Sequence, residues 1–238
     1  MENFKKKLSS LTIFFPCYND GGTIASMVTQ AMITARSLTD DLEVIVIDDC
    51  SKDNSRSILD ELKKKYDNLR LIYHDKNLGY GATLRDGFYG ATKDFIFYTD
   101  GDGQYDVREL VKLADLMKEG VGVVNGYKLK RSDPFHRKAI GKVYHFANSI
   151  MMGIKIKDVD CDFRLMRKEI FNNIKLKSNG GEICVELVRK IQDNGFRFAE
   201  AAVHHYHRRS GTSQFFRPGH VVKAIKNLTK LWASYRRS

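Results

Sequence analysis

The first half of the chain alternates short apolar runs with amphipathic stretches. The apolar runs have the length and the β-branched content of buried strands, and they cover residues 11–15, 42–47, 69–73, 95–98 and 121–124. The amphipathic stretches between them have helical spacing, at residues 23–37, 51–66, 79–92 and 107–118. Strands that alternate with helices form βαβ units around a largely parallel sheet. We therefore predict a single Rossmann-like α/β domain with a central, mostly parallel (mixed) sheet flanked by helices.

The second half of the chain is less regular. The pattern predicts helices at residues 139–152 and 182–193, a strand at 196–203, a polar loop at 204–214 and a final helix at 221–235. Neither a linker nor an internal repeat interrupts the chain. We therefore assign residues 1–216 to one domain and residues 217–238 to a basic amphipathic helix that follows it.

Polar residues follow three of the predicted strands at the point where each strand ends. The first strand leads into Pro16–Asp20, the second into Asp48 and Asp49, and the fourth into Asp100–Gln104. Asp and Gly are also common in ordinary turns. Ligands of parallel sheets bind outside the carboxyl ends of the strands, however, and three polar clusters at this edge predict a ligand site.

The sharpest local signal is Asp100-Gly101-Asp102-Gly103-Gln104. Two carboxylates separated by one glycine can converge on a hard divalent cation, and an oxygen-rich set suits Mg²⁺ or Mn²⁺ better than zinc. Gln104 can add a neutral oxygen ligand. An EF-hand loop is excluded because Val111 stands where that loop needs a glutamate.

Composition narrows the possible partners. The 238 residues carry a formal net charge of +11, which indicates an anionic partner such as nucleic acid, a phosphorylated substrate or an acidic membrane surface. No apolar run approaches the ~20 residues of a membrane-spanning helix. The 4 cysteines form no C-x-x-C pair, so reduced thiols in a cytosolic protein are the simplest interpretation.

Several enzyme classes lose support because their motifs are absent. The sequence contains no G-x-x-x-x-G-K-[ST], no G-x-G-x-x-G and no G-x-S-x-G. The histidines of His204-His205-Tyr206-His207 lack a second ligand motif nearby, and we interpret them as a polar strand end rather than a metal cluster.

The ordered motifs resemble those of family 2 glycosyltransferases with the GT-A fold. The residues Pro16–Asp20, Asp48–Asp53 and Asp100–Gln104 are similar to the P-x-Y-N-E, D-D-x-S-x-D and D-x-D-G-Q signatures of that family. Later segments resemble the branch that contains dolichyl-phosphate mannose synthase and bacterial polyprenyl-phosphate glycosyltransferases, namely Asn125–Asp133, Asp158–Arg164 and Arg208–Ser213. The resemblance extends over residues 11–216.

The resemblance implies a metal-dependent, inverting transfer of a sugar from a GDP- or UDP-sugar to a polyprenyl phosphate, with Mg²⁺ or Mn²⁺ as cofactor. It implies donor binding by Pro16, Tyr18, Asp20, Ile47, Asp49, Asp100, Gly101, Asp102 and Lys128. It assigns the metal to Asp100, Asp102 and Gln104, and the acceptor phosphate to Arg131, Arg208 and Ser213. The catalytic set is Asp102, Arg131 and Arg208.

Three residues depart from the family pattern. Asp20 replaces a glutamate, Lys128 replaces an arginine and so loses bidentate recognition, and Gln214 replaces the lysine of the mannose synthases. The last change weakens a specific prediction of mannosyl transfer.

Two alternatives remain at this point. The acceptor can be a saccharide or protein hydroxyl, which would need a general base, and the candidates are Asp160, Asp162, Glu182 and Glu186. Glu182 and Glu186 share a helix face and can equally be solvated surface charges. A basic nucleic-acid-binding domain is the other alternative, but no binding motif supports it, and we expect no nucleic-acid partner.

The C-terminal segment bears on where the protein acts. Apolar residues recur there at helical spacing among lysines and arginines, at Val221, Val222, Ile225, Leu228, Trp232 and Tyr235. Such a helix can lie on an anionic membrane or pack on the domain. We expect a cytoplasmic protein, peripheral at the cytoplasmic face of a membrane, in contact with the membrane surface or with a membrane-anchored partner.

Overall fold

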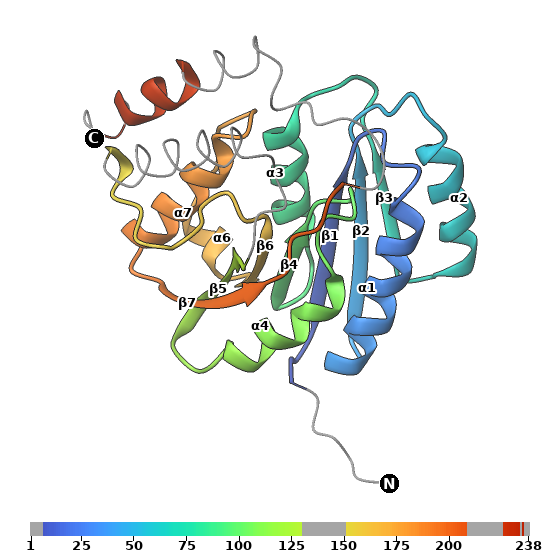
Figure 1. The fold of residues 1–238 in the computed structure, drawn as a ribbon, viewed down its shortest axis with the longest axis horizontal. Coiled ribbons are helices and arrows are strands. Elements are labelled where there is room, and N and C mark those ends of the chain that lie inside the picture. The colour runs from blue at the N-terminus through green and yellow to red at the C-terminus, as the bar shows by residue number, and fades with distance from the viewer. Residues whose placement is uncertain (1–6, 130–150, 209–225, 234, 236–238) are drawn as a thin grey trace, which may run out of the picture.

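A mixed β-sheet forms the centre of the molecule (Figure 1). The computed structural model describes residues 7–129, 151–208, 226–233 and 235. The strands in these ranges are β1 (Leu11–Cys17), β2 (Leu42–Asp48), β3 (Leu69–Tyr73), β4 (Phe95–Thr99), β5 (Val121–Lys128), β6 (Phe163–Arg167) and β7 (Arg197–Val203). Their order in the sheet is β3-β2-β1-β4-β6-β5-β7.

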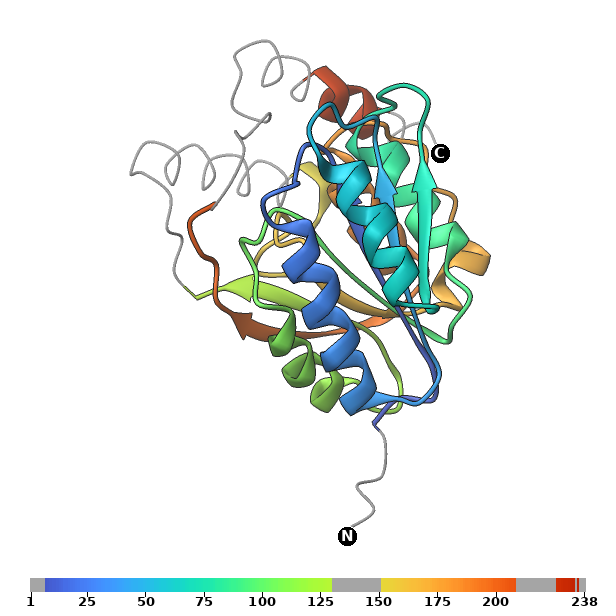
Figure 2. The ribbon, with the colours of Figure 1, turned by 90° about the vertical axis from the view of Figure 1, so that its right-hand side faces the viewer.

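Helices cover both faces of this sheet (Figure 2). They are α1 (Ile24–Leu38), α2 (Ser55–Lys65), α3 (Tyr80–Gly90), the 3₁₀ helix η1 (Val107–Glu109), α4 (Leu110–Leu116), α6 (Ile170–Asn173) and α7 (Ile183–Asp193). Side chains alternate along β1, because successive residues of a strand point to opposite faces. Ile13 and Phe15 pack with α1 and α4, whereas Phe14 packs with α3 and α7.

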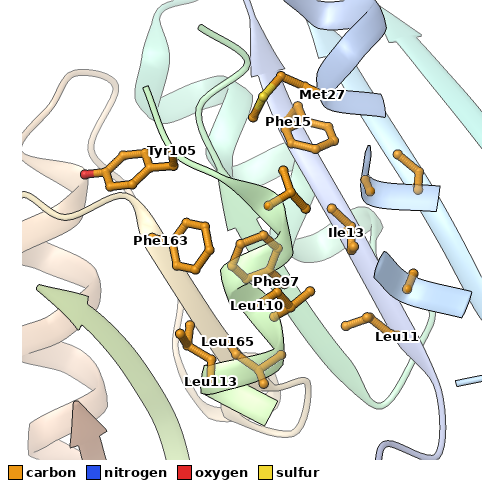
Figure 3. Packing of buried hydrophobic residues seen from close by; sticks show 14 of the residues in the cluster. Leu11, Ile13, Phe15, Met27, Phe97, Tyr105, Leu110, Leu113, Phe163 and Leu165 are labelled. Atoms are coloured by element: carbon orange, nitrogen blue, oxygen red, sulfur yellow. The ribbon is translucent and has the colours of Figure 1, made fainter. Parts of the chain in front are cut away.

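The core on the α1 and α4 side is built from apolar side chains of the central strands (Figure 3). Phe97 of β4 and Phe163 of β6 meet edge to face, with ring centroids 4.6 Å apart. Leu110 and Leu113 of α4 are buried in the same cluster. The two strands therefore share one continuous core although one of them runs against the other.

The predicted α/β fold is confirmed, and the helices and strands of the first half lie within a few residues of their predicted positions. The β1, β2, β3 and β4 strands are parallel, as predicted. The sequence pattern missed β6, which pairs antiparallel with both β4 and β5. The reason is Arg164, which is fully buried near the start of this strand and breaks the apolar run expected of a central strand.

The C-terminal helix packs against the domain where the structure describes it. Residues 226–233 are helical. Leu228 is buried in a cluster with Val185 and Val188 of α7, and Trp232 and Tyr235 are partly buried against the same cluster. The described part of the apolar stripe thus faces the domain. None of the helices in the described ranges is long and apolar enough to cross a membrane.

Candidate active site

The loop that follows β4 carries the two carboxylates of the predicted metal site. The Gly101 N–H donates to the carbonyl of Pro16 at 3.3 Å, and the Thr23 hydroxyl donates to the carbonyl of Gly101 at 2.8 Å. A Cβ at Gly101 would lie 3.1 Å from the Pro16 oxygen, so the loop sits closely against the end of β1. Asp102 is buried at the base of this loop.

The loops after β1 and β2 interlock beside it. Asn19 has a φ of +57°, and its N–H donates to the Ser51 hydroxyl at 2.9 Å. In return, the Asn19 side-chain oxygen accepts from the N–H of Lys52 at 2.7 Å. The three polar segments that follow the strands therefore lie together at one edge of the sheet, as predicted.

Acidic side chains gather at this edge of the sheet and act on one another. Burial raises the pKa of Asp100 well above its ordinary value, and the charges of Asp162 and Asp102 raise it further. Burial also raises the pKa of Asp20 to about 6, although its carboxylate accepts from the Tyr18 N–H at 3.1 Å. Carboxylates that raise each other's pKa in this way favour a cation between them.

Arg208 places a positive charge beside these carboxylates. Its Nη2 and Nε donate to Oδ2 of Asp102 at 2.8 Å and 3.1 Å. Burial alone would lower the pKa of Arg208, but the Asp102 carboxylate outweighs burial and raises it. Asp102 and Arg208, two of the three residues that the resemblance names as catalytic, are thus in contact although 106 positions separate them.

Gln104 fixes the segment that delivers Arg208. The Tyr206 N–H donates to the Gln104 carbonyl at 2.8 Å, and the Gln104 side-chain amide donates to the Tyr206 carbonyl at 3.1 Å. The nitrogen of the Gln104 amide is therefore used in holding residues 204–208 against the metal-site loop. Metal binding by the side-chain oxygen of Gln104 stays a prediction.

The donor set at this edge fits a hard divalent cation. Asp100 and Asp102 offer carboxylate oxygens on either side of Gly101, which is the chemistry that Mg²⁺ and Mn²⁺ prefer. Within the described ranges, no group of three or more His, Cys, Asp or Glu side chains is arranged to hold a metal. A cation here would complete its coordination with oxygens of substrate or water.

Other residues predicted to bind the donor already have partners within the protein. Oδ1 and Oδ2 of Asp49 accept from the N–H groups of Leu78 and Gly79 at 2.7 Å and 2.9 Å. The Lys128 ammonium donates to the Asp160 carbonyl at 2.6 Å. Ile47 is fully buried in the core, so its side chain has a packing role. The donor contacts of these three residues stay predictions.

A buried polar network beneath the site was not found from the sequence. Arg164 donates to the Tyr98 hydroxyl and to the carbonyl of Val159. The Tyr98 hydroxyl in turn donates to Asp162 at 3.2 Å. Above this network the Tyr80 hydroxyl donates to Asp100 at 2.9 Å. The only signal for Tyr80 was its place between two glycines.

Those glycines bring the start of α3 against the loop of residues 177–180. A Cβ at Gly81 would lie 2.4 Å from the carbonyl oxygen of Ser178, and the Gly81 N–H donates to the Asn179 carbonyl at 2.9 Å. The close approach explains the glycine, because any larger residue would push the two segments apart.

The candidate general bases differ in their surroundings. Glu186 accepts from the N–H of Lys177 and of Ser178 and from Lys190, and Glu182 accepts from the Gly180 N–H. Both glutamates hold the loop of residues 177–180 in place. The charge of Asp162 raises the pKa of Asp100. The predicted site residues Arg131 and Ser213, and the departure at Gln214, lie outside the described residues.

The fold is a mixed α/β sheet with acidic side chains at one edge, and sequence comparison gives the family. The glycosyl transferase family 2 profile matches residues 12–175, so the chain belongs to that family. An undecaprenyl-phosphate 4-deoxy-4-formamido-L-arabinose transferase from Proteus mirabilis is 26% identical over 168 residues, which are 70% of this chain and 52% of that protein. The Salmonella choleraesuis protein of the same name is 24% identical over 87% of this chain and 63% of its own length. The chain thus spans between half and two thirds of these relatives.

Solved structures show the same fold. Glucosyl-3-phosphoglycerate synthase from Mycobacterium tuberculosis in complex with UDP has a TM-score of 0.72 at 15% identity, covering 94% of this chain and 80% of that chain. The complex of the same enzyme with Mn²⁺, UDP and phosphoglyceric acid has a TM-score of 0.66 at 16% identity, covering 85% of this chain and 72% of that one. The predicted GT-A fold is therefore confirmed.

Proposed function

We propose that this chain transfers a sugar, with inversion, from a nucleotide-diphosphate sugar to a polyprenyl phosphate with the help of Mg²⁺ or Mn²⁺. The contact between Asp102 and Arg208 carries the proposal, because it places a potential metal ligand and a phosphate-binding group side by side. The names of the curated relatives, which act on undecaprenyl phosphate, support the same acceptor.

The chemistry of a phosphate acceptor matches what the site contains. A phosphate monoester has its second pKa near ~6 and is largely ionised at neutral pH, so it can attack the anomeric carbon without a general base. Arg208, and Arg131 as predicted, would hold it by charge-assisted hydrogen bonds. A divalent cation at Asp100 and Asp102 would neutralise the charge that develops on the diphosphate leaving group.

One observation favours a hydroxyl acceptor as a second candidate. Asp162 lies close enough to Asp100 to raise its pKa, and a carboxylate at that place could take a proton from an attacking hydroxyl. The Asp162 carboxylate, however, already accepts from the Tyr98 hydroxyl and from the Cys184 thiol, both at 3.2 Å. These bonds fit a structural role at least as well, so we keep the phosphate acceptor as the first proposal.

The donor base and the cellular site are also part of the proposal. We propose a UDP- or GDP-sugar, with UDP to be tested first because the solved neighbours hold UDP. The acceptor is a membrane lipid, so we propose that the protein acts at the cytoplasmic face of a membrane, on its surface or with an anchored partner. Basic residues of the C-terminal helix such as Lys226 and Lys230 would face anionic lipid.

The test is a panel of nucleotide sugars offered with short-chain polyprenyl phosphates and Mg²⁺ or Mn²⁺, with products identified by mass. Parallel reactions replace the lipid phosphate with the matching prenol or with a saccharide. A glycosylated polyprenyl phosphate that forms only with a divalent cation supports the proposal. Product from the saccharide and none from the lipid phosphate would reverse the order of the two candidates.

A further inference from the structure

His74, the histidine that follows β3, lies between two carboxylates. His74 is 7% exposed. Its Nδ1 lies 2.7 Å from Oδ1 of Asp49, and its Nε2 lies 2.8 Å from Oδ2 of Asp86. One carboxylate belongs to the loop after β2 and the other to α3, so the imidazole ring ties two elements of the nucleotide edge together.

This geometry requires a charged ring. A neutral imidazole has one N–H, so it can donate to only one of the two carboxylates, and its other nitrogen would place a lone pair against the second. An imidazolium donates to both. Burial alone would lower the pKa of His74, but its hydrogen bonds with Asp49 and Asp86 outweigh burial and raise the pKa above the ordinary value.

The Asp49 carboxylate connects the His74 ring to the start of α3. It also accepts from the N–H groups of Leu78 and Gly79, which lead directly into α3. The next residue, Tyr80, donates its hydroxyl to Asp100 at 2.9 Å. Hydrogen bonds, joined by the backbone of residues 78–80, thus connect His74 through Asp49 and the start of α3 to the predicted metal ligand.

We propose that His74, as an imidazolium, is a positioning residue that holds Asp49 and the Leu78–Gly79 turn in the arrangement that binds the nucleotide. The donor is bound less tightly when the ring loses its proton. The proposal rests on the proposed function, because the resemblance implies that Asp49 binds the nucleotide-sugar donor.

The other charges around the ring agree with a protonated state. From α2, Arg56 donates to the His74 carbonyl and, at 2.6 Å, to Oδ2 of Asp48, so its charge is paired next to the ring. Asp75 is exposed to solvent. Within the described ranges, the imidazole nitrogens hydrogen-bond with the carboxylates of Asp49 and Asp86.

The direction of the pH effect follows from the raised pKa. The stabilising contacts are fully present below the ordinary pKa of histidine, and they are lost as the pH rises through the higher pKa of the folded protein. The contribution of His74 to nucleotide affinity should therefore be constant at low pH and fall at alkaline pH.

The experiment measures binding of UDP with Mg²⁺ by calorimetry between about pH 6.5 and pH 9, the range in which a raised histidine pKa would be crossed. Asp86→Asn removes one carboxylate from the ring without touching the predicted nucleotide contacts. We expect its affinity to fall at a lower pH than that of the wild type. Asp75→Asn is the matched control, because it removes the same charge one residue away, and its profile should follow the wild type.

His74→Gln removes the charge and one of the two donors. We expect UDP affinity to fall about tenfold at low pH, about 1.4 kcal/mol, and to lose the fall at alkaline pH that His74 causes. A His74→Lys variant should restore part of the affinity, because an ammonium can donate to both carboxylates and stays charged over this range. Thermal unfolding of each variant identifies any that do not fold, and in that case Asp86→Asn decides.

The outcomes separate the two proposals. If the wild type binds UDP while Asp86→Asn and His74→Gln show the same affinity and the same pH profile, the role of His74 is wrong and the proposed function stands. If the wild type binds neither UDP nor GDP at any pH, the proposed function fails and the role of His74 fails with it.

Discussion

Arg208 is hydrogen-bonded to the carboxylate that a metal ion would need. Its removal should therefore change metal binding and sugar transfer in opposite directions. In the structure both guanidinium bonds of Arg208 end on Oδ2 of Asp102. A divalent cation that binds Asp102 must displace them or share the carboxylate with them. Arg208→Gln should therefore bind Mn²⁺ more tightly than the wild type while transferring sugar more slowly.

The size of the effect follows from the burial of the pair. The Asp102 side chain is 4% exposed and that of Arg208 is 28% exposed, so solvent screens the pair only in part. Hydrogen bonds to charged groups contribute about 1.5–3 kcal/mol, and removing this competitor should tighten Mn²⁺ binding roughly tenfold or more. Loss of a positive charge beside the cation acts in the same direction. Transfer should fall about 100-fold, because the guanidinium no longer stabilises phosphate charge.

Free Mn²⁺ is measured by electron paramagnetic resonance during titration of each variant without nucleotide. Arg108→Gln is the matched control: Arg108 pairs with Asp106 at 2.7 Å in the same region but is exposed, and its removal should leave Mn²⁺ binding unchanged. Equal or weaker Mn²⁺ binding by Arg208→Gln would show that Arg208 does not compete for the metal site. Unchanged transfer by that variant would contradict its place at a phosphate.

Three further changes test the site and its frame. Asp102→Ala should lower metal-dependent transfer by at least about 100-fold with an unchanged circular dichroism spectrum, and normal turnover would remove Asp102 from the metal site. Asp20→Asn should stabilise the protein by about 2–3 kcal/mol at pH 7 and not at pH 4, because the raised pKa of Asp20 makes its ionisation costly to the fold; urea unfolding at the two pH values checks this. Gly81→Ala should destabilise by about 1–3 kcal/mol, since its Cβ would collide with backbone at Ser178, whereas Gly90→Ala meets only the end of a flexible arginine and should cost little in thermal unfolding.

The sequence pattern was sufficient to predict those parts of the structure that depend on residues close together in the chain. The parallel strands β1, β2 and β4 can be recognised as apolar runs in the sequence. The polar residues after each run reach the same edge of the sheet because parallel strands share a direction. The carboxylates of Asp100 and Asp102 could therefore be placed at a ligand site without the structure. The same logic fails for β6, where Arg164 finds its partners at Tyr98 and Val159, outside its own strand.

The roles of isolated charges could not be predicted in this way. Glu182 and Glu186 share a helix face, a spacing consistent with catalysis or with a solvated surface. The structure shows both turned to the loop of residues 177–180 instead. His74 carried no signal at all, because a single histidine after a strand has no pattern, and its importance comes from carboxylates 25 and 12 positions away.

The sequence by itself determined the α/β class, the family signatures and the edge of the sheet where the acidic residues gather. Tertiary structure alone decided that Arg208 reaches Asp102, that Gln104 holds the segment carrying it, and that His74 joins Asp49 to α3. The physical reason is the distance along the sequence over which the interacting residues are spaced. Strand and helix periodicity depend on neighbours a few residues apart, whereas the partner of a buried charge is chosen by packing between segments that the sequence keeps far apart.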